Sequence, residues 1–456
     1  MQKVHLIAIG GSVMHNLAID LHLKGVKVSG SDDQIFNPSR QRLEKYGLLP
    51  TAEGWFEDKI TPDLDAVILG MHARADNPEL KRAQQLGLRI YSFPEYIYQQ
   101  AEDKQRVVIA GSHGKTTITS IILHTLQHIN RDFDYLIGAE VEGFERMVKT
   151  SHTAPVMIIE GDEYFTSVLD PTPKFWHYKH HIGVISGIAW DHINVYPSLE
   201  EYVAAFEQFA EQSPKAGTLI YSSDDPIAQV IGNKERADVN RIDYVAHPHK
   251  IKDEQTFLIG PDKQEIPLQV FGEHNMKNIQ AAKLVCLRLG VTEEQFYEAI
   301  QSFRGAANRL EKVAESEQTI IFKDFAHAPS KLRATAQAVK QQYPQHHLVG
   351  CLELHTFSSL NKEFLQQYYN TFKAADTALI YYSPETVAHK KLEEISPEDI
   401  QKAFNHKNLQ IFTDIEALKA TLLGQDWNDK VLLMMSSGSF DQLNLEALAN
   451  QIITSV

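Results

Sequence analysis

The chain has 456 residues, of which 43% are apolar, so it is long enough for two to four domains with buried cores. Its 44 Lys and Arg residues against 59 Asp and Glu residues give a formal net charge of −15, which argues against a basic surface for nucleic acid or anionic membrane. The only cysteines, Cys286 and Cys351, lack disulfide or metal-type spacing, which indicates a reducing compartment. The first apolar run ends at Gly10 and Gly11, too short for a signal peptide or a membrane span, so we expect a cytoplasmic protein.

Short apolar runs alternate with amphipathic stretches along the chain, a pattern typical of α/β folds with parallel sheets and crossover helices. The runs VHLIAIG, VKVSGSD, AVILG and LRIYS predict a first domain at residues 1–103. A second domain, 104–310, begins with RVVIAG and continues through VMIIEGD, HIGVISGIA and GTLIYSS. A third, 311–456, contains TIIFKDFAH, HLVGCLEL, TALIYY and KVLLMMSSG.

The first predicted domain contains features of a nucleotide-binding fold. Gly11 and Ser12 follow the first strand, and Ser31 and Asp32 end the second. Asp32 lies about 20 residues after Gly11, the spacing at which a dinucleotide-binding fold contacts a ribose. Taken alone, this domain is compatible with an NAD-dependent dehydrogenase, but no complete G-x-G-x-x-G motif is present, and a UDP-binding domain explains the same residues.

The stretch RVVIAGSHGKTTITSIILHTL predicts a strand, a glycine turn and a helix. Its turn resembles a phosphate-binding loop, although two residues separate its glycines where the common pattern has four. Lys115 is placed to reach the β and γ phosphates of a nucleotide, and the Thr116 hydroxyl is placed to bind Mg²⁺. The predicted phosphate-binding residues are Gly111, Ser112, His113, Gly114, Lys115, Thr116 and Thr117.

Polar residues follow two later strands of the second predicted domain. Glu160, Asp162 and Glu163 come at the end of VMIIEGDEY, where carboxylates beside a phosphate loop suit Mg²⁺. Asp191 and His192 follow HIGVISGIA in the same manner. The histidine tract HYKHH lacks cysteines or carboxylates at ligand spacing, so we expect no zinc there.

Further motifs resemble the ATP-dependent Mur ligases of peptidoglycan synthesis. FGEHNMKNIQAA, NRLEKV and KDFAHAP match that family, whose central loop is of the same shortened type. The resemblance covers nearly the whole chain. It implies a Rossmann-like UDP-sugar-binding domain, a P-loop central ATPase domain and a Rossmann-like C-terminal domain. Within the family, EGDEYFTSVLDPTPKFWHY, LELHTFSSL and SSGSF are most similar to the peptidoglycan-recycling UDP-N-acetylmuramate:L-alanyl-γ-D-glutamyl-meso-diaminopimelate ligases. The UDP-N-acetylmuramate:L-alanine ligases of de novo synthesis are the alternative.

The resemblance also implies roles for individual residues. The implied catalytic residues are Lys115, His192 and Arg309. Besides the loop, the implied ATP contacts are Asn275, Asn278, Arg309 and Asp324. The implied ligands of Mg²⁺, or of Mn²⁺ in its place, are Thr116, Glu160 and His192. The implied UDP-sugar contacts are Gly11, Ser12, Ser31 and Asp32, and the implied peptide contacts are His327 and His355.

The chemistry implied by the resemblance explains these residue types. ATP phosphorylates the lactyl carboxylate of UDP-N-acetylmuramate, and the free amine of a peptidoglycan-derived tripeptide then attacks the acyl phosphate. Both steps accumulate negative charge, which lysine, arginine and Mg²⁺ stabilise while the site positions the reactants. Neither nucleic acid nor membrane is an expected partner, and both a monomer and a homodimer remain open.

The chain departs from the family pattern at several positions, among them Ala8, Phe206, Ala328 and His355. Ala8 stands where the family usually has glycine, in the segment VHLIAIGGSVMHNLA. Phe206 stands where some sister ligases carry a lysine whose carbamate binds metal, a lysine that the muramate-using members also lack. A non-catalytic ATP-binding regulator on the same fold is a further alternative, against which the combined presence of the implied catalytic residues counts.

Overall fold

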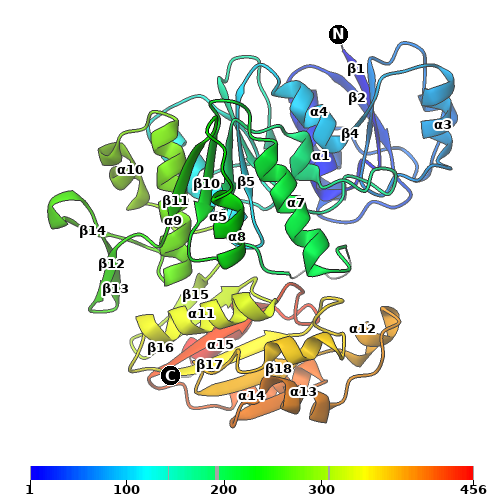
Figure 1. The fold of residues 1–456 in the computed structure, drawn as a ribbon. Helices are drawn as coiled ribbons and strands as arrows, with labels where there is room; N and C mark the ends of the chain where they lie inside the picture. Colours follow the sequence, from blue (N-terminus) through cyan, green and yellow to red (C-terminus); the bar gives the residue numbers. More distant parts are fainter. Residues whose placement is uncertain (1, 142, 191–194, 307–308, 455–456) are drawn as a thin grey trace. The chain divides into compact units, whose positions relative to one another are not determined.

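The computed structural model describes residues 2–141, 143–190, 195–306 and 309–454 (Figure 1). Contacts within the chain divide it into two compact units. The first unit comprises Met1–Ile188, Leu199–Val245 and Ala281–Phe296, and the second comprises Ala189–Ser198, Ala246–Gln280 and Tyr297–Val456. Within the described ranges, no helix combines the length and apolar character that are needed to cross a bilayer.

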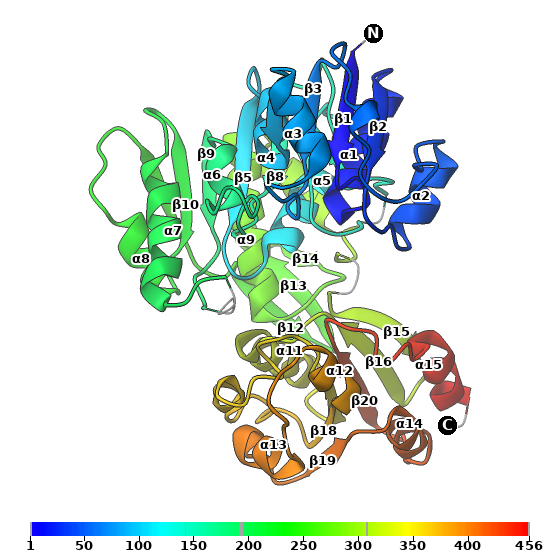
Figure 2. The same ribbon diagram turned by 90° about the vertical axis from the view of Figure 1, so that its right-hand side faces the viewer.

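The N-terminal part of the first unit is a four-stranded parallel sheet in the order β2-β1-β3-β4, in which β1 lies between β2 and β3 (Figure 2). Its strands are β1 Lys3–Ile7, β2 Lys27–Ser31, β3 Ala66–Leu69 and β4 Ile90–Ser92. Its helices are α1 Ser12–Leu23, α2 Ser39–Lys45, η1 Glu57–Lys59, α3 Pro78–Gln85 and α4 Phe93–Gln100. Ile7 pairs with both Ser31 and Leu69, so the carboxyl ends of the three adjacent strands are level.

The rest of the first unit is built on a seven-stranded sheet in the order β11-β10-β9-β5-β8-β6-β7, in which only β7 runs antiparallel to its neighbour. Its strands are β5 Gln105–Ala110, β6 Asp134–Leu136, β7 Val148–Lys149, β8 Val156–Glu160, β9 Ile182–Ile185, β10 Thr218–Ser222 and β11 Asn240–Tyr244. Its helices are α5 Lys115–His128, α6 Lys174–His177, α7 Leu199–Glu211 and α8 Pro226–Gly232. Because β5 lies between β8 and β9, the segments after these three strands meet at one edge.

The two sheets of the first unit are joined through a buried carboxylate on α1. Asp20 accepts hydrogen bonds from Arg146 at 3.0 Å and from the backbone N–H of Thr150 at 3.1 Å. Beside it, Asn16 Oδ1 accepts the backbone N–H of Met147 at 3.0 Å. Burial raises the pKa of Asp20, and the bonds to Thr150 and the charge of Arg146 only partly offset it. Helix α1 is therefore fixed to the segment that leads into β7.

The second unit contains two sheets. A three-stranded antiparallel sheet comprises β12 His249–Lys252, β13 Gln255–Ile259 and β14 Glu265–Pro267, with η2 at Pro261–Lys263. A six-stranded sheet has the order β15-β16-β20-β17-β18-β19, with β15 antiparallel to the rest. Its strands are β15 Glu311–Glu315, β16 Thr319–Asp324, β17 His347–Glu353, β18 Thr377–Tyr381, β19 Leu409–Phe412 and β20 Lys430–Met435. Its helices are α11 Pro329–Gln342, η3 Phe364–Tyr368, α12 Pro384–His389, α13 Pro397–Phe404, α14 Ile415–Leu423 and α15 Leu445–Thr454. Helices α9 Glu273–Arg288 and α10 Glu293–Ile300 each belong partly to both units.

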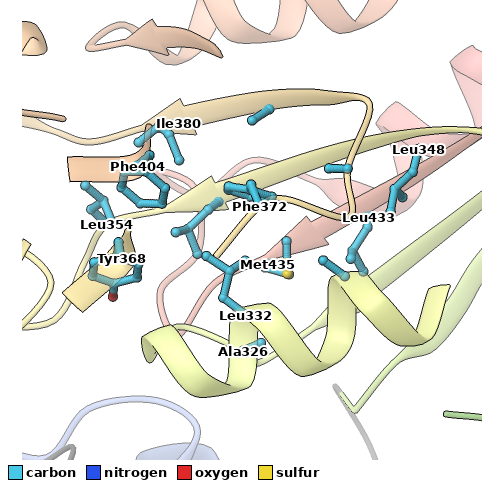
Figure 3. Close-up of a cluster of buried hydrophobic side chains, with 14 of the residues drawn as sticks. Ala326, Leu332, Leu348, Leu354, Tyr368, Phe372, Ile380, Phe404, Leu433 and Met435 are labelled. Carbon is cyan, nitrogen blue, oxygen red and sulfur yellow. The ribbon is translucent and has the colours of Figure 1, made fainter. Parts of the chain in front are cut away.

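One face of the six-stranded sheet is covered by a dense apolar cluster (Figure 3). Leu332 of α11 faces Met435 of β20, and the rings of Tyr368 and Phe404 stack with centroids 4.9 Å apart. Phe372 lies so close to β17 that a Cβ atom on Gly350 would come within 2.4 Å of its ring. The parallel α/β architecture predicted from the sequence is confirmed in both units.

Replacing Phe372 by alanine tests this cluster. We expect the variant to lose roughly 3–5 kcal/mol of unfolding free energy in this unit, because the ring is fully buried and its removal leaves a cavity beside Gly350 of β17. The matched control is Phe357→Ala, whose ring is 51% exposed and which we expect to cost less than about 1 kcal/mol. Urea denaturation of both variants measures the difference, and equal midpoints would contradict the packing described.

Candidate functional site

The predicted phosphate loop joins β5 to α5 in a conformation that requires its glycines. Gly111 has φ +132° and Gly114 has φ +76°, both in the region that side chains disfavour. A Cβ atom on Gly111 would lie 2.1 Å from Ser186 Oγ, just beyond β9. Gly114 forms the N-cap of α5, so the positive end of that helix lies next to the turn.

The segment after β9 holds the loop in place. The backbone N–H of Ser112 donates to the carbonyl of Gly187 at 2.9 Å, and the Ser186 hydroxyl donates to the carbonyl of His113. The hydroxyl of Ser112 also bonds to the hydroxyl of Tyr202 on α7, at 2.8 Å. These bonds fix the start of α5 before any phosphate binds, which is the preorganisation that anion binding needs.

Lys115 is the first residue of α5, and its ammonium group folds back over the loop. Nζ donates to the Gly111 carbonyl at 2.6 Å and lies 2.7 Å from Glu163 Oε2. Burial alone lowers the pKa of this ammonium, but the adjacent charge of Glu163, with those of Glu160 and Asp162, reverses the effect and holds the pKa above its usual value. Lys115 is therefore charged at neutral pH. In the sequence, Glu163 stands among the candidate metal ligands of VMIIEGDEY, and nothing there indicates that it pairs with Lys115.

The predicted metal-binding pair is brought together next to the loop. The Thr116 hydroxyl donates to Glu160 Oε1 at 2.8 Å, and the backbone N–H of Gly138 donates to Oε2 at 2.9 Å. These are hard oxygen donors at the end of a strand, and they fit Mg²⁺ or Mn²⁺ once the Thr116 hydroxyl turns its lone pair towards the metal. Asp162 points elsewhere, because Lys174 donates to its carboxylate at 2.6 Å.

The other predicted ligand of this centre, His192, lies outside the described residues, as does Asp191. Among the residues that are described, no three His, Cys, Asp or Glu side chains gather as a metal cluster. The first unit thus presents Lys115, Thr116 and Glu160 at the edge where β5 and β8 end.

The histidines of the tract HYKHH pack and hydrogen-bond within the first unit. His177 Nε2 is 3.2 Å from Asp170, and the ring of His180 packs on Phe209 with centroids 4.3 Å apart. Burial lowers the pKa of His180 to about 3, so it is neutral. His181 Nδ1 accepts a backbone N–H at 3.1 Å. Each of these three histidine rings therefore contacts a neighbouring residue of the first unit.

Phe206 of α7 is fully buried between two other aromatic side chains. Its ring centroid lies 5.4 Å from that of Phe175 and 5.2 Å from that of Tyr202. The position at which some sister ligases carry a modified lysine is therefore part of an apolar layer that holds α7 against α6.

The N-terminal glycine turn has an unusual residue at its start. Ala8 has φ +67°, a left-handed conformation that glycine adopts without strain and other residues rarely adopt. This conformation fits the glycine that the resemblance leads us to expect at this position. Asp32 Oδ2 accepts the backbone N–H of Gly10 at 2.7 Å, and burial raises the pKa of Asp32 to about 6. The predicted contacts Gly11 and Asp32 thus lie at one edge of the first sheet.

The other two predicted UDP contacts differ in accessibility. Ser12 begins α1, beside the turn, and its hydroxyl lies 3.7 Å from the sulfur of Met147. Ser31 is fully buried, and its hydroxyl accepts from Lys59 at 2.9 Å. Ser31, although it ends β2, is therefore buried, whereas Ser12 is exposed beside the turn.

In the second unit, Asn275 and Asn278 lie on one face of α9, as their spacing predicts. The amide nitrogen of Asn275 donates to the Phe271 carbonyl at 2.9 Å, and that of Asn278 lies 3.4 Å from Asn275 Oδ1. Both side chains are largely buried.

Arg309, Asp324 and His327 are also neighbours within the second unit. Asp324 accepts the backbone N–H groups of Leu310 at 2.6 Å and Ala326 at 2.7 Å, so its carboxylate shapes the turn after β16. Burial raises the pKa of Asp324, and the charge of Arg309 only partly offsets this. The guanidinium of Arg309 lies over the ring of Phe325, 4.8 Å from its centroid. The His327 ring packs edge-on against the same ring.

His355 belongs to a cluster in which the sequence predicts His355 as a site residue but does not indicate Glu353 or Ser436. Its Nδ1 is 3.6 Å from Glu353, the buried last residue of β17, which also accepts the hydroxyl of Ser436 and, at 2.8 Å, the backbone N–H of Phe440. Burial raises the pKa of Glu353, but these hydrogen bonds outweigh burial and hold the pKa below its usual value. A Cβ atom on Gly438 would lie 2.8 Å from both His355 and Glu353, so the loop after β20 approaches this pair closely. Glu353 and Ser436 are far apart in sequence, which is why no spacing indicated the cluster.

Three family models together match most of the chain. The model described as "Mur ligase family, catalytic domain" matches residues 3–105, "Mur ligase middle domain" matches 109–286, and "Mur ligase, glutamate ligase domain" matches 308–438.

Curated proteins align with the chain over most of its length. A UDP-N-acetylmuramate–L-alanine ligase of Arthrobacter sp. (strain FB24) is 31% identical over 389 residues, which are 83% of this chain and 80% of that protein. The protein of the same name from Sulfurihydrogenibium sp. (strain YO3AOP1) is 28% identical, and the alignment covers 97% of this chain and 96% of that protein.

Solved structures share the fold. The UDP-N-acetylmuramate-alanine ligase of Thermotoga maritima superposes with a TM-score of 0.71 at 20% identity, over 100% of this chain and 99% of its own. A murein peptide ligase of Psychrobacter arcticus 273-4 gives a TM-score of 0.64 at 20% identity, over 100% and 98% of the two chains. With its three domains matched in order, its short phosphate loop and its paired Thr116 and Glu160, the chain belongs to the Mur ligase family of ATP-dependent enzymes that form carbon–nitrogen bonds.

Proposed function

We propose that this enzyme joins the lactyl carboxylate of UDP-N-acetylmuramate to the amine of L-alanine, with one ATP consumed for each amide bond. The observation that carries the ligase chemistry is the Lys115–Thr116–Glu160 group at the end of the phosphate loop. The choice of L-alanine is supported by the curated relatives, which carry that name and align with most of the chain.

A second amine is kept as a candidate because specific residues favour it. The segments EGDEYFTSVLDPTPKFWHY, LELHTFSSL and SSGSF are similar to those of the recycling ligases that attach L-alanyl-γ-D-glutamyl-meso-diaminopimelate. A murein peptide ligase also shares the fold. The two candidates use the same carboxylate and the same ATP chemistry, and they differ only in the amine. An NAD-dependent dehydrogenase and a non-catalytic regulator lose their support, since the family consists of ATP-dependent ligases.

The proposed reaction has two steps. In the first, a lactyl carboxylate oxygen attacks the γ-phosphorus of ATP, and ADP leaves. The N-terminus of α5 and the charged Lys115 stabilise the phosphates as negative charge builds up. Thr116 and Glu160 would hold Mg²⁺ or Mn²⁺, which supplies further charge neutralisation when it is bound.

In the second step, the amine nitrogen attacks the acyl carbon, the carbon–oxygen bond to phosphate breaks, and the amine loses a proton. The proposed contributions of the second unit are nucleotide contacts from Asn275, Asn278, Arg309 and Asp324. His327 and His355 are proposed to contact the amine substrate, and His192 is proposed to complete the metal site. We retain the division at residues 1–103, 104–310 and 311–456, and a cytoplasmic location, as parts of this proposal.

The identity of the amine is tested by ADP release with UDP-N-acetylmuramate, Mg²⁺ and ATP, with L-alanine and the tripeptide offered separately. We expect turnover with L-alanine, and the product mass should show the new amide. Turnover with the tripeptide alone would replace L-alanine by the second candidate. Absence of turnover with both amines would contradict UDP-N-acetylmuramate as the carboxylate substrate.

The metal site is tested by Glu160→Gln, which keeps the shape of the side chain but removes its charge. We expect at least about a 10-fold increase in the Mg²⁺ concentration that supports half-maximal activity, because a charged oxygen ligand is replaced by an amide. Glu235→Gln is the matched control, since Glu235 is an exposed carboxylate in the same unit. A Mg²⁺ requirement that is the same in both variants would contradict the assignment of Glu160.

A further inference from the structure

The loop between β8 and α6 holds apolar side chains in solvent although its backbone is rigidly braced. Val168 is 70% exposed and Leu169 is 42% exposed. Exposed apolar side chains at the tip of a mobile loop are common, but a braced loop that presents them has a fixed apolar surface to offer to a ligand.

The bracing comes from hydrogen bonds across the base of the loop. Thr172 O accepts both the backbone N–H of Thr166, at 2.8 Å, and its hydroxyl, at 2.9 Å. The hydroxyl of Thr172 donates to Asp170 at 2.6 Å, and the other oxygen of Asp170 lies 3.2 Å from His177. The tip can therefore move little without breaking several bonds.

The loop runs between the two sites that the proposed reaction must connect. Near its start lies Glu163, which pairs with Lys115 of the phosphate loop. At its tip, the backbone N–H of Val168 donates to the carbonyl of Met71, at 3.3 Å, just beyond β3. The neighbour of Met71, Gly70, leaves no room for a side chain beside Ala8 at the start of the N-terminal turn.

The loop contacts both sites, through Glu163 and Val168, so a substrate that bridges them lies beside the loop. The UDP-sugar contacts expected from the sequence lie around the N-terminal turn, at Gly11, Ser12, Ser31 and Asp32, and the carboxylate of the sugar must reach the γ-phosphate that Lys115 is proposed to hold. The part of UDP-N-acetylmuramate that precedes the carboxylate is the lactyl ether with its methyl group. This group is the apolar feature that UDP-N-acetylglucosamine lacks.

We infer that Val168 is a specificity-determining residue that packs against the lactyl group of the bound UDP-sugar. This inference rests on the proposed function, because it assumes a UDP-sugar that carries a lactyl ether. Val168 contributes to the selection of the muramate over the same sugar without the ether, and it does not take part in phosphate transfer.

Calorimetric titration of the two UDP-sugars tests the inference, with the full chain saturated by Mg²⁺ and a non-hydrolysable ATP analogue. Val168→Ser removes apolar surface at the tip, and Val168→Thr replaces one methyl group by a hydroxyl group with little change of shape. The control is Val230→Ser on α8, where Val230 is 66% exposed and far along the chain from the loop. Thermal midpoints verify that each variant is folded.

We expect Val168→Ser to weaken UDP-N-acetylmuramate binding by about 3- to 10-fold, and Val168→Thr by a smaller factor in the same direction. Binding of UDP-N-acetylglucosamine should change by less than about twofold in all variants. Equal weakening of both sugars, or no effect of either Val168 variant, overturns the inference. If the unaltered protein does not prefer UDP-N-acetylmuramate over UDP-N-acetylglucosamine, the proposed substrate is wrong, and the inference about Val168 is wrong with it. This result is distinguishable from failure of the inference alone, in which the unaltered protein prefers UDP-N-acetylmuramate but the Val168 variants do not change that preference.

Discussion

The nucleotide site depends on the close approach of the turn at Gly111 to the end of β9. Because a Cβ atom at this position would collide with Ser186, the turn can follow this path only with glycine. The path fixes where α5 begins, and Lys115 and Thr116 are its first two residues. The direction in which they point, towards the carboxylates after β8, is therefore set by backbone packing between neighbouring parallel strands.

The electrostatics of the site depend on the charged residues that lie at this edge of the sheet, Lys115, Glu160 and Glu163. A buried lysine loses stability in its charged form unless an anion is close, and Glu163 supplies that anion. Nucleotide binding would bring several more negative charges to the same place, where the charged lysine lies beside Thr116 and Glu160, the proposed metal ligands. A family of amide ligases can then vary its amine substrate in other loops while this arrangement stays the same.

Features that are contiguous in sequence were predictable. The GSHGKT loop, the strand that precedes it and the helix that follows it each have a local signal, and the parallel α/β architecture follows from repeated apolar runs. Thr116 and Glu160 lie together beside the loop, because the segments after adjacent parallel strands meet at one edge, and their role as metal ligands is still a prediction. His192, by contrast, lies outside the described residues, so its place beside this pair is still a prediction.

Contacts between distant segments were not predictable. Nothing in the spacing distinguishes Glu163, which pairs with the lysine, from Asp162, which turns towards Lys174. The cluster of Glu353 and Ser436 requires two strands that are adjacent only in the folded sheet. Sequence motifs and overall similarity favour different amines here.

Isotope transfer tests the central claim, that an acyl phosphate forms on the lactyl carboxylate of UDP-N-acetylmuramate. The carboxylate is labelled with ¹⁸O in both oxygens, and the phosphate released during amide formation is analysed by mass spectrometry. Our account predicts that each phosphate carries one labelled oxygen, because the bond that breaks in the second step joins the acyl carbon to that oxygen. Unlabelled phosphate, or label found in AMP, would contradict it.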